Sequence, residues 1–151
     1  MKLIAHKGKV NGPESLKENT PEQIEWCIEN GYDVEIDVRY SPEKDKFYLG
    51  HDDLQHEINW WWLAGKQKNL WIHCKDLFTL HEFTARTSGY NYFWHQRDDY
   101  TLTSKGQIWA SPAQDYNKDT VRVIEDPEEV KEYDCYAICS DYVGKLNRPQ
   151  P

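Results

Sequence analysis

The chain has 151 residues, of which 38% are hydrophobic and 29% charged, and its formal net charge is −8. This length is typical of one domain with a substantial core, and an aromatic content of 14% excludes a disordered chain. The negative charge disfavours nonspecific nucleic-acid binding, because such binding depends on Lys and Arg side chains that neutralise phosphates. We therefore expect one globular domain, residues 1–151, that does not bind nucleic acid.

Neither the N-terminus nor the cysteines indicate export. The stretch MKLIAHKGKV holds an apolar run too short for a signal peptide, and no segment approaches transmembrane length. The four cysteines form no CxxC pair and have no zinc-ligand spacing; they are Cys27, Cys74, Cys135 and Cys139. Buried free thiols are the expected state, which favours a reducing, cytoplasmic setting without an integral membrane segment.

Predicted strands and helices alternate along the chain. A strand at residues 2–6 precedes a helix with Thr20 as N-cap, Pro21 as its first residue and Gly31 as its C-cap. A strand then runs to Ser41, and a turn at residues 42–45 leads into a strand at 47–50. The remaining predicted elements are strands at 70–74, 91–95, 107–110, 121–124 and 136–140, and helices at 59–65, 77–86 and 127–133. Strands that alternate with short helices indicate a parallel α/β arrangement.

The segment YDVEIDVRYS, residues 32–41, alternates strictly between apolar and charged residues. Val34, Ile36 and Val38 point to one face, which reads as buried, and Glu35 and Asp37 point to the other. On this segment alone, the carboxylates are expected to face solvent, as in many half-buried strands. In a barrel wall, however, the same alternation places them toward the interior.

Polar residues gather where the predicted strands end, which is the edge at which parallel sheets carry their functional groups. His6, His51 and His95 stand at three such ends, and Asp141 follows the last strand. The strand period also places His73 on the same face as Lys75, opposite Ile72 and Cys74. His56 and His81 are predicted to be structural.

Three stretches, in this order and spacing, resemble the glycerophosphodiester phosphodiesterase family: IAHKG, ENTPEQIEWCIENGYDVEIDVRYS and FYLGHD. The family pattern is His-Arg-Gly, Glu-Asn-Thr, a helix before Glu-x-Asp-Val, and His-Asp. WIHCKDL and CSDY are similar to two later strands of the family. The resemblance implies a TIM barrel, which ordinarily needs about 250 residues. We therefore expect a shortened TIM-type (β/α) barrel of parallel strands with reduced or missing helices.

The resemblance also implies the site. It assigns two catalytic histidines, a carboxylate pair that holds a divalent cation, and groups that contact the phosphate or lie beside it. These are His6 and His51 as acid and base, Glu35 and Asp37 as metal ligands, Lys7 and Lys75 at the phosphate, and Glu18 near His6 or the metal. Carboxylate oxygens suit Mg²⁺ or Ca²⁺, which would polarise a phosphodiester.

Two positions depart from the family pattern. Lys7 replaces an arginine, so a bidentate fork becomes a point charge. His73 replaces a third metal-ligating glutamate, and its nitrogen shifts the preference toward Mn²⁺ or another transition metal if it ligates. Alternatively, His73 binds no metal.

We therefore expect a metal-dependent phosphodiester hydrolase, and two alternatives stay open. One is a lyase or transferase that acts on a phosphodiester in a cell-surface precursor, and the other is a non-catalytic protein that binds a phosphorylated ligand. The run Trp60-Trp61-Trp62 cannot share one helix face, so at least one ring is expected to be exposed while the others pack in the core or grip a ligand. A shortened barrel with exposed strands would also gain from homodimerisation.

Overall fold

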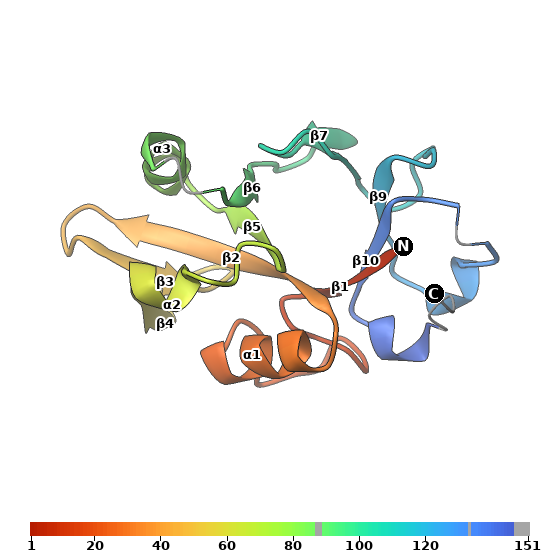
Figure 1. Cartoon of the computed structure of the whole chain (residues 1–151), viewed down its shortest axis with the longest axis horizontal. Coiled ribbons are helices and arrows are strands. Elements are labelled where there is room, and N and C mark those ends of the chain that lie inside the picture. Colours follow the sequence, from red (N-terminus) through yellow and green to blue (C-terminus); the bar gives the residue numbers. More distant parts are fainter. Residues whose placement is uncertain (87–88, 133, 147–151) are drawn as a thin grey trace.

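One mixed sheet of ten strands organises the part of the chain that this computed structural model describes, which is residues 1–86, 89–132 and 134–146 (Figure 1). The strands are β1 (Lys2–His6), β2 (Asp33–Ser41), β3 (Lys46–Leu49), β4 (His56–Ile58), β5 (Leu70–Cys74), β6 (Asn91–Phe93), β7 (Tyr100–Leu102), β8 (Ile108–Ala110), β9 (Thr120–Val123) and β10 (Ala137–Ser140). The sheet curls into a half-barrel, and its interior holds the site described below.

β2 is the branching point of this sheet. One of its edges pairs in parallel with β1 through residues 33–35 and then antiparallel with β3 through residues 38–41. Its other edge pairs in parallel with β5, which in turn pairs with β6. From β1 the sheet continues in parallel through β10, β9 and β8, and β7 closes the row as an antiparallel partner of β8. The carboxyl ends of β1, β2 and β5 therefore lie side by side.

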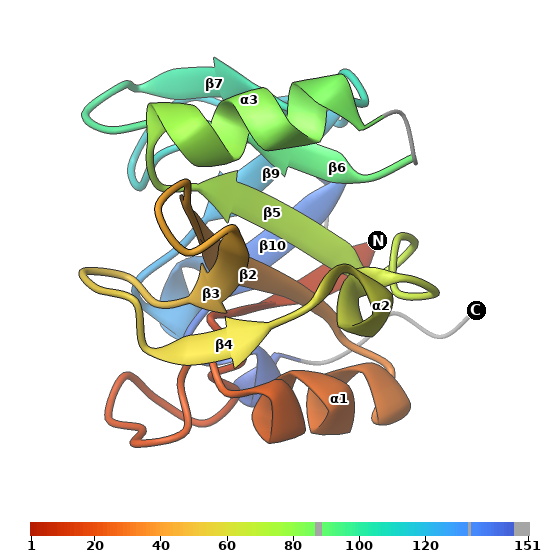
Figure 2. The same cartoon turned by 90° about the vertical axis from the view of Figure 1, so that its left-hand side faces the viewer.

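Three short α-helices accompany the sheet: α1 (Pro21–Glu29), α2 (Trp60–Leu63) and α3 (Leu77–Ala85). α1 begins as predicted, with Pro21 in its first turn and the Thr20 hydroxyl accepting a hydrogen bond from the Gln23 backbone N–H at 3.3 Å. α1 and α3 lie on the outer side of the curled sheet, and α2 lies at its amino end, just before β5 (Figures 1 and 2). None of the described helices is long and apolar enough to cross a membrane.

The predicted TIM-type barrel is wrong. Only α1 and α3 connect parallel neighbours, and the strands added at β3, β4 and β7 are antiparallel. In the described residues no strand pairing joins β6 to β7, so the sheet curls without closing. The physical reason is length, since eight strand–helix units need about 250 residues and this chain has 151. The chain bridges most of its later strands with turns instead of helices.

The last predicted helix is also shorter than expected. Residues 127–133 were predicted as helical, but the structure has a 3₁₀ turn, η1, at Pro127–Glu129, and a second turn, η2, at Val143–Lys145. Tyr133 lies outside the described residues. Asp126 caps η1 by accepting a hydrogen bond from the Glu128 backbone N–H at 2.9 Å, and Glu128 and Glu129 follow in its first turn. A proline start and acidic residues favour a turn here, but too few apolar side chains follow to bury a longer helix.

Two clusters of buried apolar residues pack against the two faces of the sheet. The outer cluster packs Val34, Ile36 and Val38 of β2 together with Ile24 of α1 and Phe83 of α3, which are all at most 1% exposed. The inner cluster fills the curl with Ile4, Trp71, Phe93, Trp109, Val121, Ala137 and Cys139. The predicted alternation of β2 is therefore confirmed, because its apolar residues face the helices while Glu35 and Asp37 face the interior.

The side chains of the three consecutive tryptophans point in different directions, because adjacent residues of a helix cannot share one face. Trp60 packs in the outer cluster, with ring centroids 5.6 Å from Phe47 and 5.7 Å from Phe83. Trp62 donates its Nε1–H to Glu25, and Trp61 is 85% exposed. Because α2 lies at the amino end of β5, none of these rings lines the cavity at the carboxyl ends.

Candidate metal centre and active site

A cavity of about 370 Å³ opens at the carboxyl ends of β1, β2 and β5, above the inner apolar cluster. Seven of the eight predicted site residues line it, and Glu18 is the exception. Its charged or ionisable lining residues are His6, Lys7, Glu35, Asp37, His51, His73, Lys75 and His95. The topology gathers them because neighbouring parallel strands end at the same edge.

Glu35, Asp37 and His73 form a buried three-residue cluster with ligand atoms all within 4.8 Å of one another. His73 Nδ1 lies 3.3 Å from Asp37 Oδ1 and 3.8 Å from Glu35 Oε1. β2 and β5 position these groups, because Asp37 and His73 are register partners in the parallel pair. Two carboxylates and an imidazole at this spacing form a donor set suited to a divalent cation.

The hydrogen bonds of the cluster support this fit. His73 Nε2 lies 3.1 Å from the backbone carbonyl oxygen of His95, which can only accept, so Nε2 carries a proton. In the neutral ring, the Nδ1 lone pair then faces the carboxylates, and the buried Asp37 Oδ1 has no hydrogen-bond partner. Either a second proton on His73 or a cation must occupy this region. A divalent cation would satisfy all three donors, with the His95 carbonyl fixing the ring as an outer partner.

The two carboxyl groups of this cluster differ in pKa. Burial raises the pKa of Glu35 well above its usual range, and the neighbouring charge of Asp37 raises it further. Burial would also raise the pKa of Asp37, but the interactions with His73, Asn19 and Lys75 outweigh it, so the pKa of Asp37 lies below its usual range. Protein groups alone thus stabilise one negative charge here. A bound cation would allow Glu35 to ionise as well.

Asn19 holds Asp37 in place from the loop before α1. Its side-chain N–H donates to Asp37 Oδ2 at 3.0 Å, and its Oδ1 accepts from the Asp37 backbone N–H at 3.0 Å. Asn19 is fully buried and has a φ of 54°, a conformation that Asn tolerates better than most residues. Lys75 Nζ lies 3.9 Å from the other oxygen of Asp37 and faces the same cavity. Asn19 lies in the ENT motif directly after Glu18, and that position is the only sign of its role in the sequence.

His6 is held by Asp141, at the end of β10. His6 Nδ1 lies 2.7 Å from Asp141 Oδ1, and His6 Nε2 lies 3.6 Å from Glu35 Oε2. The buried Lys9 places its Nζ 3.2 Å from the same Asp141 oxygen. Burial would raise the pKa of Asp141, but the His6 hydrogen bond and the charges of His6 and Lys9 lower it below its usual range. The ionised Asp141 therefore orients His6 through Nδ1, a role that its position in the CSDY motif did not reveal.

Glu18 contacts the lysines rather than His6 or the Glu35–Asp37–His73 cluster. Its Oε2 lies 3.6 Å from Lys7 Nζ and 4.0 Å from Lys9 Nζ. The Lys7 backbone N–H donates to Glu35 Oε2 at 3.2 Å, and Lys7 adopts a φ of 56° to reach it. Lys7 thus contributes a backbone donor to the cluster and a side-chain charge to the cavity wall.

His51 enters the cavity from the turn after β3. Its Nδ1 lies 2.8 Å from Asp52 Oδ1, and its side chain is 45% exposed. Arg39 of β2 donates to the backbone carbonyls of both Gly50, at 3.0 Å, and His51. A Cβ at Gly50 would lie 2.0 Å from the Asp53 carbonyl oxygen, so only glycine fits this turn. His51 is therefore a partly exposed side chain on a backbone that Arg39 holds in place.

His95 completes the wall behind His73. The two rings stack with centroids 4.7 Å apart, and Phe93 stacks on His73 at 5.3 Å. Burial lowers the pKa of His95 to about 4, helped by the charges of His73 and Lys75. His95 is therefore neutral at pH 7, and it supports His73 through its ring and carbonyl.

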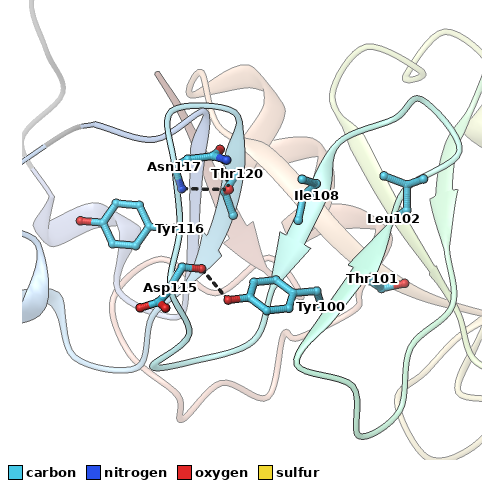
Figure 3. A pocket seen from close by; sticks show the side chains of 8 residues that line it. All are labelled: Tyr100, Thr101, Leu102, Ile108, Asp115, Tyr116, Asn117 and Thr120. Atoms are coloured by element: carbon cyan, nitrogen blue, oxygen red, sulfur yellow. Dashed lines mark hydrogen bonds between the residues drawn. The ribbon is translucent and has the colours of Figure 1, made fainter.

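A second hollow, of about 580 Å³, lies on the outer face of β7, β8 and β9 (Figure 3). Its apolar lining comes from Tyr100, Leu102, Ile108 and Tyr116, and the Tyr100 hydroxyl donates to the Asp115 carbonyl at 2.8 Å. Asp115 is the one acidic side chain in its lining. The residues that line this hollow include no metal-ligand set and no acid–base pair, whereas the inner cavity holds the Glu35–Asp37–His73 cluster.

Comparisons of the chain with family models, with curated proteins and with solved structures gave no match.

Proposed function

We propose that the protein is a metal-dependent phosphodiester hydrolase of the glycerophosphodiester phosphodiesterase type. The observation that carries this proposal is the convergence of a Glu35–Asp37–His73 cluster with His6, His51 and Lys75 on one cavity. Cleaving a phosphodiester requires charge compensation at the phosphoryl oxygens, a base for the nucleophile and an acid for the leaving oxygen. Each requirement has a candidate group in this cavity.

Glu35, Asp37 and His73 would hold the divalent cation. When bound, the cation would polarise the phosphoryl group and compensate its developing negative charge. The mixed oxygen and nitrogen donor set suits Mn²⁺ in addition to Mg²⁺ or Ca²⁺. Lys75, which faces the same cavity, adds a positive charge for the phosphate.

His6 is the general base. Its Nδ1–H donates to Asp141, which leaves Nε2 free to accept a proton from the attacking water. The water oxygen bonds to phosphorus, and the bond from phosphorus to the leaving oxygen breaks. His51, in its protonated form beside Asp52, donates a proton from its ring to that leaving oxygen. The products are a phosphomonoester and an alcohol, and both histidines regain their starting states by exchanging protons with solvent.

We place this activity in the cytoplasm. All four cysteines are free and buried, namely Cys27, Cys74, Cys135 and Cys139. Free thiols are typical of a reducing compartment, and burial raises the pKa of Cys27 to about 11, which keeps that thiol protonated.

The test is turnover by the purified chain after metal removal with EDTA and reloading with Mg²⁺, Ca²⁺ or Mn²⁺. We expect metal-dependent cleavage of glycerophosphocholine and of bis(4-nitrophenyl) phosphate. His6→Ala should reduce turnover by at least about 100-fold. His81→Ala, on the exposed side of α3, is the matched control and should leave it unchanged.

Three results would contradict the proposal. The first is no turnover with any of the three metals, and the second is equal turnover by the wild type and His6→Ala. The third is a cyclic phosphate as the end product, which would indicate attack by a neighbouring hydroxyl of the substrate instead of water.

A further inference from the structure

The inner cavity has two chemically different sides. Eight of its fourteen lining residues are charged or ionisable, and all of these except His95 lie on β1, β2 and β5 or just after β1, β3 and β5. The other six have no ionisable side chain, and we call them the neutral wall: Phe93, Gln96, Trp109, Ser111, Pro112 and Val123. These six lie on β6, β8 and β9 or follow β6 and β8 within three positions.

Contacts join the neutral wall into one surface. The rings of Phe93 and Trp109 have centroids 4.7 Å apart, which joins β6 to β8. Ser111 joins the end of β8 to the loop after β6, because its hydroxyl donates to the Asp98 carbonyl at 2.6 Å. β8 also pairs in parallel with β9, which carries Val123. The wall therefore borders one continuous part of the cavity.

The rings of the neutral wall give a cation no open face. Phe93 and Trp109 are only 2% and 3% exposed. Their rings pack on each other, and they also pack on His73 and Trp71 respectively. A cation–π contact needs an accessible ring face, so these rings form an apolar floor instead.

The nearby charges do not supply a partner for a cation either. Three charged residues follow Gln96 without lining the cavity: Arg97, Asp98 and Asp99. On the catalytic side, Lys7 and Lys75 bring positive charge to the cavity, beside a cluster that would hold a divalent cation. A positively charged group at the neutral wall would therefore lose hydration without gaining a partner.

Gln96 is the polar residue of the wall that is available to a ligand. The Ser111 hydroxyl is already bonded to the Asp98 carbonyl, whereas no hydrogen bond joins the Gln96 side-chain amide to another of the described residues. The Gln96 backbone N–H donates to Asp98 Oδ2 at 3.0 Å, which fixes the backbone of this residue. Its amide can donate to, and accept from, an oxygen of a bound alcohol.

We propose that the neutral wall is the subsite for the alcohol group that stays on phosphorus during hydrolysis, and that it selects an uncharged alcohol. This inference deepens the proposed function and rests on it. In the proposed mechanism, His51 protonates the leaving oxygen on the catalytic side of the cavity. The second alcohol group of the phosphodiester then needs other space in the same cavity, and the neutral wall lines that space. Gln96 is the residue that determines its specificity.

An adjacent hollow offers the alternative place for this group. The hollow has a volume of about 320 Å³ and shares three lining residues with the inner cavity, among them His6. It also contains Asp141, which is paired with His6 and Lys9, and Glu125. Glu125 is exposed to solvent, so its pairing with a cationic alcohol would be weak. The neutral wall is therefore the favoured subsite.

The test compares two substrates that differ in the charge of the retained alcohol: 4-nitrophenyl phosphocholine and 4-nitrophenyl 3,3-dimethylbutyl phosphate. 4-Nitrophenol leaves from both, and the two retained groups have nearly the same shape. The ratio of the two kcat/KM values therefore reports the charge preference of the subsite. We expect the wild type, loaded with Mn²⁺, to favour the uncharged ester by roughly tenfold or more.

A charge placed on the neutral wall should change this ratio. Gln96→Glu should shift it by about tenfold toward the choline ester, because the new carboxylate attracts the ammonium group. Gln67→Glu makes the same chemical change in the loop between α2 and β5, outside the cavity lining, and is the matched control that should keep the wild-type ratio. A general loss of turnover affects both substrates and leaves the ratio intact.

Several results would overturn the inference while leaving the proposed function in place. They are equal kcat/KM values in the wild type, a preference for the choline ester, and an unchanged ratio in Gln96→Glu. A choline preference that Glu125→Gln abolishes would place the retained alcohol in the adjacent hollow. A chain that cleaves neither ester with Mg²⁺, Ca²⁺ or Mn²⁺ would contradict the proposed function and the inference with it.

Discussion

At the scale of single residues, the polar contacts of the site meet at Asp37. Asn19 binds its Oδ2 and its backbone N–H, while His73 and Lys75 face its Oδ1. The carboxylate is therefore fixed in orientation before any cation binds, which lowers the reorganisation that binding requires. Its partners come from two separate segments of the chain, the loop before α1 and the end of β5.

We predict that Asn19→Gly weakens binding of Mn²⁺ by about 10- to 100-fold, because Asp37 loses both hydrogen bonds from this side chain. Glycine tolerates the φ of 54° at this position, so the effect reports on the hydrogen bonds and not on backbone strain. The measurement is isothermal titration calorimetry with Mn²⁺. Unchanged affinity in the folded variant would show that Asn19 does not support the ligand set.

Lys9 acts on His6 through Asp141, and this contact leads to a second prediction. Lys9→Met should lower kcat roughly tenfold and leave KM within about twofold, because the variant loosens the orientation of the base without touching the substrate. Lys9→Arg keeps the positive charge beside Asp141 and should retain most of the turnover. Equal loss in both variants, or a rise in KM alone, would contradict a positioning role for Lys9.

At the scale of elements, the turn after β3 determines where His51 lies. β3 pairs antiparallel with the end of β2, and the Gly50 backbone N–H donates to the Asp37 carbonyl at 3.1 Å. This antiparallel pair therefore brings a histidine from a loop to the end of a parallel strand. Arg39, which lies on β2, stabilises the turn by donating a hydrogen bond to the Gly50 carbonyl.

We expect Gly50→Ala to destabilise the fold by at least about 2 kcal/mol and to reduce turnover. The added Cβ would meet the Asp53 carbonyl oxygen at 2.0 Å, and Gly50 has a φ of 157°. Gly106→Ala is the matched control, since Gly106 also has a positive φ, of 86°, but no atom lies within 4 Å of its added Cβ. The control should lower the free energy of unfolding by only about 1 kcal/mol, because alanine disfavours the positive φ. Urea unfolding measures both, and equal losses would contradict a steric role for Gly50.

At the scale of the whole molecule, the polar centre lies in an incompletely closed sheet. The inner apolar cluster lies on the same face of the sheet as Glu35, Asp37 and His73, and the outer cluster packs against the other face of the strands that carry these residues. The buried carboxylates oppose folding unless they are compensated. A cation should therefore stabilise the native state of the entire chain.

We predict that Mn²⁺ at 100 times its dissociation constant raises the free energy of unfolding by about 2.7 kcal/mol, because the ligand set exists only in the folded state. The measurement is urea unfolding in Mn²⁺ and in EDTA. Asp37→Asn should show no such difference, although it should still unfold cooperatively. Equal stabilisation of both proteins would place the metal elsewhere.

Local pattern alone determined the faces of the strands and the start of the first helix. The alternation of Val34 and Glu35 along β2 placed the apolar and the acidic side chains on opposite faces, and Thr20 and Pro21 placed the start of α1, because side-chain period and capping depend only on nearby residues. The alternation did not decide that the acidic face is the interior one, since on this segment alone that face was expected to meet solvent. The tertiary structure decided that the sheet curls without closing, with β3, β4 and β7 antiparallel. It also decided that Asp141 holds His6, since that contact joins residues 135 positions apart. Pairing between distant segments depends on which connections the chain length permits, and no local period encodes it.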